Sequence, residues 1–552
     1  MNLPNPIELW FYLSTNLLVD ANVEKLEQLF ERAGKAGYSK VLLADSKFSR
    51  LAEMEPRYFQ NVERAKAAAA KNHLAIVPAI FPIGYSEGLL SHDPNLAEAL
   101  LVKDDPFVVV NGEARPEAKP IALTKPEWKD DVFKEEGGES GKPGGWRCRD
   151  AGATNARLVF KLKVAPFRAY HLALTIETKE FEGEPRAQVL VEGGGLLFSN
   201  LGVQKSQPPT RHHAVFNSLD HDEVRLYVGA WGAGSGELAI RDITLEEAGL
   251  VNLVRREDAT FEVSRVGKTD GERGARLIEG RDFEPVSDPK MGTVPWRGGF
   301  EVWHEPPPIR TKLPDGTRLL VSWSHAITVL DGQTMICLSE PKTLELLEDE
   351  CRRIGALFGK NSGTAGTAAG SHEYFLSHDE IRVLNQDESC RAKKLDAGAL
   401  LAENARACTK IVRGVDPAAQ LWIWSDMFDP THNAAGPGDG RGSYYLVRGD
   451  LRGAWEGLDP AVSIADWNFD RRDESLAFFA GRGHRLLLAG YYDAPSERIG
   501  EIDAWLASAR RLVPKTPKSG AAPPFVVMYT TWQSRYDDLE RFAARVRDHD
   551  GG

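Results

Sequence analysis

The sequence predicts an α/β protein built as a (β/α)8 TIM barrel, with an antiparallel, jelly-roll-like β-sandwich inserted after the third barrel strand. Strand-like and helix-like patterns alternate over residues 1–124, give way to short strand-like runs over 125–250 and 251–330, and resume over 331–552. Three buried strand-like runs before the insertion and five after it make the eight that a barrel needs. A doubly wound open sheet is the structural alternative.

The first part of the barrel is predicted from the alternation of strand-like and helix-like segments. Apolar runs at Glu8–Leu13, Lys40–Asp45 and Leu74–Ile80 have the length and composition of buried strands. Between them, Val23–Ala36 has apolar residues at helical spacing and Tyr58–Lys71 is rich in alanine. A βαβαβ order of this kind favours a parallel sheet covered by helices.

The insertion is predicted from a change in pattern. Short runs of alternating polarity, such as Arg157–Val164, His171–Ile176 and Val224–Val228, are separated by Gly, Pro and Asn. Many short strands with turn residues between them are typical of an antiparallel sandwich of the kind found in carbohydrate-binding modules. A β-rich return segment over 251–330, including Arg318–Trp323, is expected to lead back to the barrel.

The rest of the barrel is predicted over 331–552. Ser339 is a candidate N-cap for a helix that runs through Leu357, with Pro341 in its first turn. Five strand-like runs follow, with helical segments between them: Glu373–Leu376, Gln420–Trp424, Val462–Trp467, His484–Ala489 and Phe525–Tyr529.

Composition and charge limit the partners. The net charge of -12, with no basic tract, argues against nucleic acid or an anionic membrane as the main partner, and no run approaches the roughly 20 apolar residues of a membrane span. The 5 cysteines are scattered without CxxC spacing, so we expect buried thiols, no metal site and no disulfide framework. No cofactor is predicted, a cytoplasmic location is the default expectation without a signal-peptide pattern, and the oligomeric state stays open.

Polar and aromatic residues follow nearly every predicted barrel strand, where barrel enzymes build their sites. Carboxylates and aromatic rings together indicate a pocket for a neutral polyhydroxylated ring, and no GxxxxGK or GxGxxG motif follows a strand. These strand-end residues are Tyr12, Asn16, Asp45, Lys47, Phe81, Tyr85, His378, Asp379, Glu380, Arg382, Trp424, Asp426, Asp466, Trp467, Tyr491, Tyr492, Asp493, Tyr529, Trp532 and Gln533.

The adjacent carboxylates Asp379 and Glu380, after the fourth strand, are the leading catalytic candidates. Two neighbouring carboxylates repel each other, which can leave one protonated beside an ionised partner. A common alternative for such a pair is the first turn of a helix. His378 could tune the pair or be a structural histidine. Trp422 and Trp424 alternate, so we expect one to fill the barrel core and the other to reach the site.

With these motifs in order, the last five strands resemble the catalytic domain of the β-N-acetylhexosaminidases, glycoside hydrolase family 20. The resemblance covers residues 370–540. It rests on Asp379-Glu380, on Trp424-Ser-Asp-Met427, on Trp467, on Tyr491-Tyr-Asp493 and on Trp532, each at the end of a successive strand. The acid pair is also similar to that of the family 123 β-N-acetylgalactosaminidases.

The resemblance implies a retaining, substrate-assisted hydrolysis of a terminal β-linked N-acetylhexosamine on a glycan. Asp379 would hold the acetamido nitrogen, Tyr492 would bond the acetamido oxygen, and Glu380 would act as general acid and base. The three tryptophans would wall the sugar. The implied substrate-binding residues are Asn16, Asp45, Lys47, His378, Arg382, Trp424, Asp426, Trp467, Tyr491, Asp493, Tyr529 and Trp532.

Departures from the family bear on which sugar is bound. The family has an arginine after strand one and an acidic residue after the last tryptophan, where this chain has Tyr12 with Asn16, and Gln533. Because these positions read the ring hydroxyls, N-acetylgalactosamine is favoured over N-acetylglucosamine. Two other functions stay open: a glycosidase pairing Glu380 with Asp426 or Asp466 on a sugar without an acetamido group, and an inactive carbohydrate-binding protein.

Overall fold

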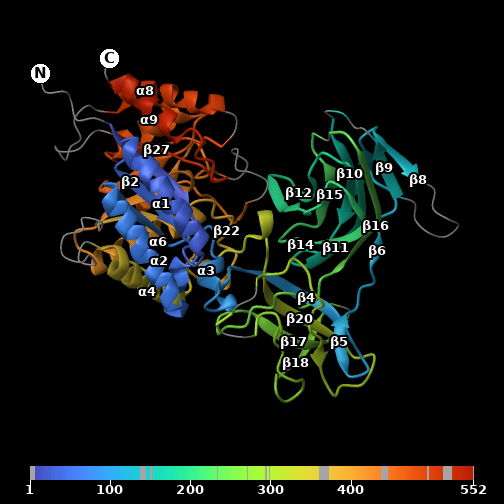
Figure 1. The fold of residues 1–552 in the computed structure, drawn as a ribbon. Helices are drawn as coiled ribbons and strands as arrows, with labels where there is room; N and C mark the ends of the chain where they lie inside the picture. The colour runs from blue at the N-terminus through green and yellow to red at the C-terminus, as the bar shows by residue number, and fades with distance from the viewer. Residues whose placement is uncertain are drawn as a thin grey trace, which may run out of the picture.

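The predicted barrel is confirmed in a computed structural model that describes residues 7–136, 145–149, 152, 154–232, 234–269, 271–292, 295–296, 299–359, 372–436, 445–493, 496–513 and 525–550. Within these residues, 8 parallel strands close into a barrel (Figure 1). The strands, in barrel order, are β1 (Glu8–Ser14), β2 (Lys40–Ala44), β3 (Ala75–Ile80), β21 (Glu373–Leu376), β23 (Gln420–Trp424), β25 (Val462–Asp466), β26 (Leu486–Ala489) and β27 (Phe525–Tyr529).

Large side chains fill the inside of the barrel, and helices cover its outside. Trp10 and Trp422 meet edge to face at 4.8 Å between ring centroids, and Trp424 belongs to the same buried cluster. Apolar stripes face the strands, as expected for helices packed on a sheet. The helices of the outer layer are α1 (Asp20–Lys35), α2 (Pro56–Lys71), α4 (Pro341–Phe358), α6 (Ala397–Val415), α7 (Arg472–Gly481), α8 (Glu501–Leu512) and α9 (Leu539–Asp550).

The start of α4 corrects one prediction. Glu340, rather than Ser339, is the N-cap residue, and its side chain makes no capping hydrogen bond. The Ser339 hydroxyl instead accepts a hydrogen bond from the Cys390 thiol at 3.2 Å. The Ser339 hydroxyl therefore makes a tertiary hydrogen bond to Cys390 instead of the predicted bond to the helix N-terminus.

The inserted sandwich consists of two antiparallel sheets with strand orders β13-β12-β15-β10-β7 and β14-β11-β16-β9-β8 (Figure 1). Its strands are β6 (Ile121–Ala122), β7 (Trp128–Lys129), β8 (Phe133–Glu136), β9 (Gly145–Arg149), β10 (Ala156–Lys163), β11 (Ala169–Lys179), β12 (Pro185–Val191), β13 (Gly194–Asn200), β14 (Gln207–Asn217), β15 (Glu223–Ala230) and β16 (Glu237–Glu247).

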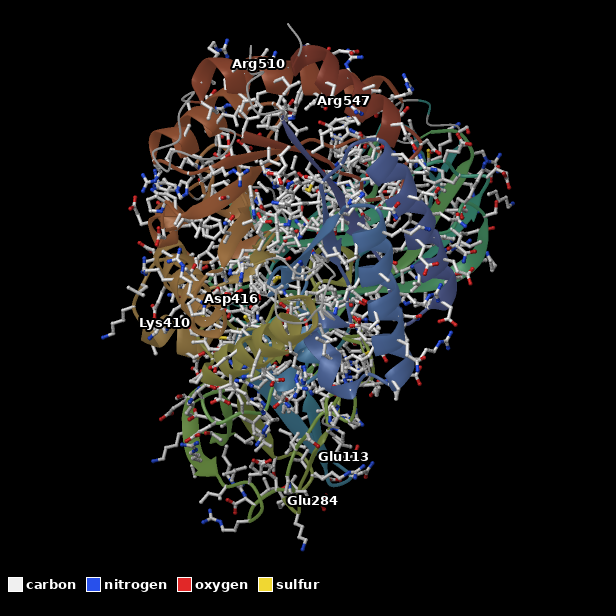
Figure 2. All side chains as sticks on the ribbon, turned by 60° about the vertical axis from the view of Figure 1, so that its left-hand side comes forward. Glu113, Glu284, Lys410, Asp416, Arg510 and Arg547 are labelled. Atoms are coloured by element: carbon white, nitrogen blue, oxygen red, sulfur yellow. The ribbon has the colours of Figure 1, made fainter. Side chains whose placement is uncertain are left out.

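A third antiparallel sheet is formed by segments that precede and follow the sandwich in the sequence, because β20 of the return segment pairs with β4. Figure 2 shows this sheet region, marked by Glu113 and Glu284, at the end of the molecule opposite Arg510 and Arg547 of α8 and α9. Its order is β18-β17-β20-β4-β5-β19, formed by β4 (Ala99–Val110), β5 (Glu113–Pro116), β17 (Phe261–Val266), β18 (Arg273–Leu277), β19 (Ile309–Arg310) and β20 (Arg318–Ala326).

The insertion leaves and re-enters the barrel at one place. Ala97 forms an antiparallel bridge with Ile336, flanked by the hydrogen bonds Cys337 N to Leu96 O at 2.8 Å and Glu98 N to Met335 O at 2.7 Å. Strands β3 and β21, on either side of the insertion, are therefore neighbours in the barrel. All 5 cysteines are buried free thiols, as predicted, and no helix among the described residues has the length and apolarity to cross a bilayer.

Candidate functional site

A cavity of about 740 Å³ opens at the carboxyl ends of the barrel strands, and a smaller one of about 180 Å³ adjoins it. Five residues line both: Tyr85, Asp379, Glu380, Trp424 and Trp532. Trp467 completes the lining of the smaller cavity. The predicted acid pair and the three predicted tryptophans thus meet at one place, where a sugar-sized molecule can be enclosed.

The backbone at Glu380 brings both carboxylates to the same space. Successive side chains in an extended segment point to opposite sides, but Glu380 has a φ of 51°, in the left-handed region. Its N–H donates to Asp426 Oδ2 at 2.9 Å, which anchors this conformation. A non-glycine residue in this region is uncommon and often marks a functional site.

Gly84, in the loop after β3, makes room for this turn. A Cβ on Gly84 would lie 1.6 Å from the Asp379 carbonyl oxygen, so the two backbones touch. Gly84→Ala is expected to push the pair out of place and lower kcat/KM about 10²-fold, the typical effect of a 1 Å misplacement. Gly414→Ala is the control, because nothing lies within 4 Å of its added methyl group. Equal activity in the two variants would contradict the role of Gly84.

Two donors hold the Glu380 carboxylate. The Tyr85 hydroxyl donates to Glu380 Oε2, and Arg382 Nη2 lies 2.8 Å from the same oxygen. Arg382 Nε donates in turn to Gln333 Oε1, and the guanidinium lies 5.3 Å from the centre of the Tyr445 ring. These contacts fix the orientation of the carboxylate and stabilise a negative charge on it.

The neighbouring Asp379 has the opposite electrostatic surroundings. Desolvation raises the pKa of Asp379 well above its usual range, and the charges of Asp426 and Glu380 raise it further. In the free site Asp379 therefore keeps a proton at pH values where an exposed aspartate is ionised.

Aromatic rings form the walls of the cavity. Tyr12 lies edge-on to Trp532 and Trp424, with ring centroids 5.1 and 6.4 Å apart, and Trp424 and Trp532 are 5.6 Å apart. Trp532 remains 44% exposed, so its ring is accessible from the cavity mouth. Trp467 is held by a hydrogen bond from its indole nitrogen to Asp426 Oδ1 at 3.4 Å. Faces of this kind suit the apolar faces of sugars.

Eight of the fifteen predicted site residues line the cavities. Asp45 lines the cavity, but its carboxylate accepts hydrogen bonds from Leu17 N at 3.0 Å, Lys47 N at 2.9 Å and the Tyr58 hydroxyl at 3.0 Å. It therefore shapes the loop that presents Lys47. The eight are Asp45, Lys47, Asp379, Glu380, Arg382, Trp424, Trp467 and Trp532.

Tyr492, assigned a catalytic role by the resemblance, lies outside both cavities, and this prediction is corrected. Its ring stacks on Tyr529 at 5.5 Å and packs on Phe542 of α9 at 4.8 Å. The chain turns after β26 so that the Tyr492 hydroxyl lies against Gly490, where an added Cβ would be 2.2 Å away. The side chain thus belongs to the core between β27 and α9.

The other predicted residues support the site from outside the cavities. His378 is buried, its Nε2 lies 3.1 Å from Asn404 Oδ1, and burial lowers the pKa of His378 to about 4, so it stays neutral. Asp426 anchors Glu380 and Trp467 as described. The Asp493 carboxylate accepts from the backbone N–H of Trp532 and thereby holds its loop.

Three further predicted residues make contacts with residues close to them in the sequence. Asn16 Oδ1 accepts from Leu18 N at 3.0 Å, and the Tyr529 hydroxyl donates to Arg535 O at 2.9 Å. Tyr491 stacks under the Arg498 guanidinium at 5.1 Å. None of the three lines either cavity, and their assignment as substrate contacts stays a prediction.

Gln333 lines the cavity but was not predicted, whereas Tyr12 and Tyr85, which also line it, were predicted as strand-end residues without an assigned role. Both tyrosines stand at strand ends, so position was the available signal. Gln333 comes from the end of the return segment and reaches Arg382 only through the tertiary fold. Nothing in the local sequence marks it.

Comparisons with known proteins found similarity to solved structures at low sequence identity and low TM-scores. No family model and no curated protein sequence matches it. A rhamnosidase structure from Novosphingobium sp. PP1Y matches 95% of the chain at 12% identity with a TM-score of 0.31, and the chain spans about half (55%) of that protein's length.

Two other structures match smaller parts of the chain. A GH20 module of a pneumococcal exo-β-D-N-acetylglucosaminidase matches 39% of this chain and 51% of its own, at 14% identity and a TM-score of 0.24. A carbohydrate-binding module from Cellvibrio mixtus lichenase 5A, solved with cellotriose, matches 23% of this chain and 96% of its own, at 10% identity and a TM-score of 0.18.

Proposed function

We propose that this chain is a glycoside hydrolase: a retaining exo-β-N-acetylhexosaminidase that prefers a terminal β-linked N-acetylgalactosamine. The observation that carries the proposal is the shared position of Asp379 and Glu380 on one cavity walled by Trp424, Trp467 and Trp532. Two carboxylates with different surroundings are what acid and base roles require.

In the proposed reaction the smaller cavity receives the acetamido group. The acetamido N–H donates to Asp379 while the acetamido oxygen attacks the anomeric carbon and forms an oxazoline. Glu380 gives its proton to the departing glycosidic oxygen. It then takes a proton from the water that opens the oxazoline, which restores the acetamido group with net retention.

Binding of the substrate would move the proton from Asp379 to Glu380. In the free site Asp379 keeps a proton, because desolvation and the neighbouring carboxylates raise its pKa. A donated acetamido N–H favours the ionised form of Asp379. The proton then moves to Glu380, where the leaving group needs it. A sugar without the acetamido group lacks this N–H donor and would leave the proton on Asp379. The proton transfer would therefore favour acetamido sugars as substrates.

The raised pKa of Asp379 sets the expected pH dependence. In the proposed reaction the active free enzyme carries a proton on Asp379, and this form is lost as pH rises through the raised pKa of Asp379. We expect kcat/KM to persist well above pH ~4, the usual carboxyl range, before its alkaline limb appears. A pH profile of kcat/KM checks this, and a decline beginning near pH ~4 would contradict it.

Tyr85 takes the place that the resemblance gave to Tyr492. It lines the smaller cavity and donates to Glu380, whereas Tyr492 is buried in the core. Tyr85→Phe is expected to lower kcat about 10- to 100-fold, the effect of losing a hydrogen bond to a charged group. Tyr492→Phe should keep full activity. Steady-state kinetics on both variants test which tyrosine acts in catalysis. An inactive Tyr492→Phe with an unaffected Tyr85→Phe would return the catalytic role to Tyr492.

The rival with two separated carboxylates finds less support. Asp426 is fully buried and accepts from Glu380 N, Asn433 Nδ2 and Trp467 Nε1, and neither Asp426 nor Asp466 lines a cavity. Burial raises the pKa of Asp466 to about 8, which opposes an ionised nucleophile. The sugar preference rests on the sequence departures at Tyr12, Asn16 and Gln533.

Release of p-nitrophenol from its β-GalNAc, β-GlcNAc, β-glucoside and β-galactoside derivatives tests the proposal. We expect hydrolysis of the two acetamido sugars only, faster for GalNAc, with competitive inhibition by an oxazoline-mimicking thiazoline. Turnover of the plain hexosides without thiazoline inhibition would point to the rival mechanism. No turnover of any of the four, with sugar binding by calorimetry, would leave a binding protein.

A further inference from the structure

A second cluster of chemically reactive side chains lies away from the catalytic cavity. Glu98, Cys337 and Cys390 are 1%, 0% and 0% exposed, and one ligand atom from each lies within 4.8 Å of the other two. We propose that these three residues bind one thiophilic divalent cation, with Zn²⁺ as the best fit. The site would join the insertion to the barrel and is independent of the proposed catalytic function.

The distances match a tetrahedral zinc site. Cys337 Sγ lies 3.6 Å from Cys390 Sγ, and Cys390 Sγ lies 3.4 Å from Glu98 Oε2. Zinc bonds of ~2.3 Å to sulfur and ~2.0 Å to oxygen require separations of roughly 3.8 Å and 3.5 Å at tetrahedral angles. Two of the three ligand separations therefore already fit a zinc ion, and the third, between Cys337 Sγ and the Glu98 carboxylate, lies within 4.8 Å. Water or a neighbouring hydroxyl would supply the fourth ligand.

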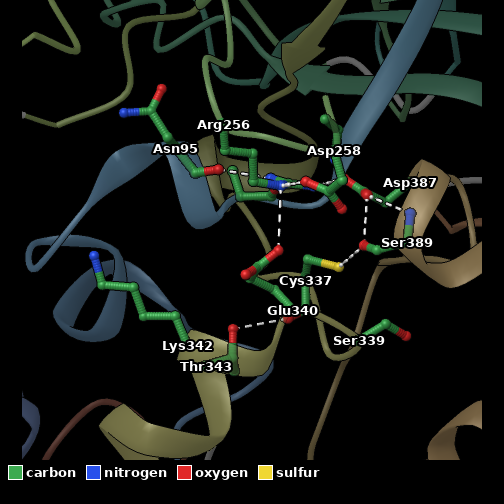
Figure 3. A network of polar contacts seen from close by, with 12 residues as sticks. Asn95, Arg256, Asp258, Cys337, Ser339, Glu340, Lys342, Thr343, Asp387 and Ser389 are labelled. Carbon is green, nitrogen blue, oxygen red and sulfur yellow. Dashed lines mark hydrogen bonds and ion pairs between the residues drawn. The ribbon is translucent and has the colours of Figure 1, made fainter. Parts of the chain in front are cut away.

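The surrounding contacts orient the ligand atoms. Glu98 Oε1 accepts the backbone N–H groups of Gln386 at 2.7 Å and Asp387 at 2.9 Å, which leaves Oε2 directed at Cys390. The Ser389 hydroxyl lies 3.3 Å from Cys337 Sγ, and Figure 3 shows this contact continuing through Ser389 to Asp387. Hydrogen bonds of this kind position metal ligands in known sites.

The charge balance of the cluster also favours a cation. The guanidinium of Arg256 lies beside the cluster, but it pairs with Asp387, Asp258 and Glu340 (Figure 3). Three buried acidic groups must either stay protonated or share a cation. Binding of M²⁺ would release the two thiol protons, and that of Glu98 when it is protonated, to solvent.

The chain positions explain why the sequence does not reveal such a site. Glu98 precedes β4, Cys337 follows the return bridge, and Cys390 lies in the short helix α5 (Glu388–Ala392). A metal here would fasten three segments, one of which follows the loop that carries Arg382. No CxxC spacing results from ligands so far apart.

Metal content of the full-length protein tests the site. Protein prepared under reducing conditions is stripped with a chelator, incubated with Zn²⁺, desalted and measured by mass spectrometry of the metal. We expect one zinc per chain in wild type and in Cys351→Ala, which removes a buried thiol of α4 outside the cluster. Cys337→Ala and Cys390→Ala should lose the zinc and the rise in melting temperature that zinc gives wild type.

Cobalt provides a readout of the ligands themselves. Co²⁺-loaded wild type should show thiolate-to-cobalt charge-transfer absorption in the near ultraviolet. Glu98→Gln should keep this band but weaken binding at least 10-fold, and this variant retains the cluster's volume if a cysteine variant fails to fold. Reduced, folded wild type without bound metal would overturn the proposal. So would equal metal content in folded cysteine variants, or a Cys337–Cys390 disulfide in the native protein.

Discussion

Glu380→Gln is expected to lower kcat on a β-N-acetylhexosaminide by about 10²- to 10⁴-fold, the contribution of a general acid and base. The amide keeps the side-chain volume and can still contact Tyr85 and Arg382, but it cannot transfer a proton. The loss should shrink on a dinitrophenyl glycoside, whose leaving group needs no protonation. Rates on poor and good leaving groups measure this difference.

The matched control for this variant is Glu87→Gln. Glu87 lines the rim of the larger cavity, is exposed and lies in the short helix α3 (Glu87–Leu90). Its replacement removes a carboxylate from the same cavity without touching the acid pair. Wild-type rates for Glu380→Gln on every leaving group would exclude its catalytic role.

Asp379→Asn is expected to lower kcat about 10²- to 10³-fold, the usual effect of removing one preorganised electrostatic contact to a transition state. In the proposed reaction the intermediate with its N–H retained is an oxazolinium ion, and Asp379, which lines the smaller cavity, would balance its positive charge. The amide leaves that charge without a partner.

Inhibitor binding separates this role from that of Glu380. A thiazoline that mimics the oxazoline should bind Asp379→Asn much more weakly than wild type, and should bind Glu380→Gln almost as well. Equal thiazoline affinity in wild type and Asp379→Asn would show that Asp379 does not contact the acetamido group.

The barrel could be predicted because its strands are buried on both sides and read as continuous apolar runs. The predicted bounds of Glu373–Leu376, Gln420–Trp424 and Phe525–Tyr529 match β21, β23 and β27. The acid pair was found because its two members are adjacent in sequence and follow a strand. Both are properties of local sequence.

Other parts of the site depend on tertiary geometry. Neither of the two neighbouring tyrosines after β26 lines the described cavities, and the turn at Gly490 buries Tyr492 against α9. Gly84 and Gln333 act on the site only because the loop after β3 and the end of the return segment meet the loop after β21. No local pattern carries that information.

The bridge between Ala97 and Ile336 has a consequence for the order of folding. Pairing of β3 with β21 closes a loop of the chain that contains the whole insertion. The conformational entropy lost on this closure grows with the logarithm of the loop length. Once the insertion has folded and its ends are joined at the bridge, only the segments 81–95 and 338–372 remain to be closed. We therefore expect barrel closure to be a short-range event once the inserted sheets have folded.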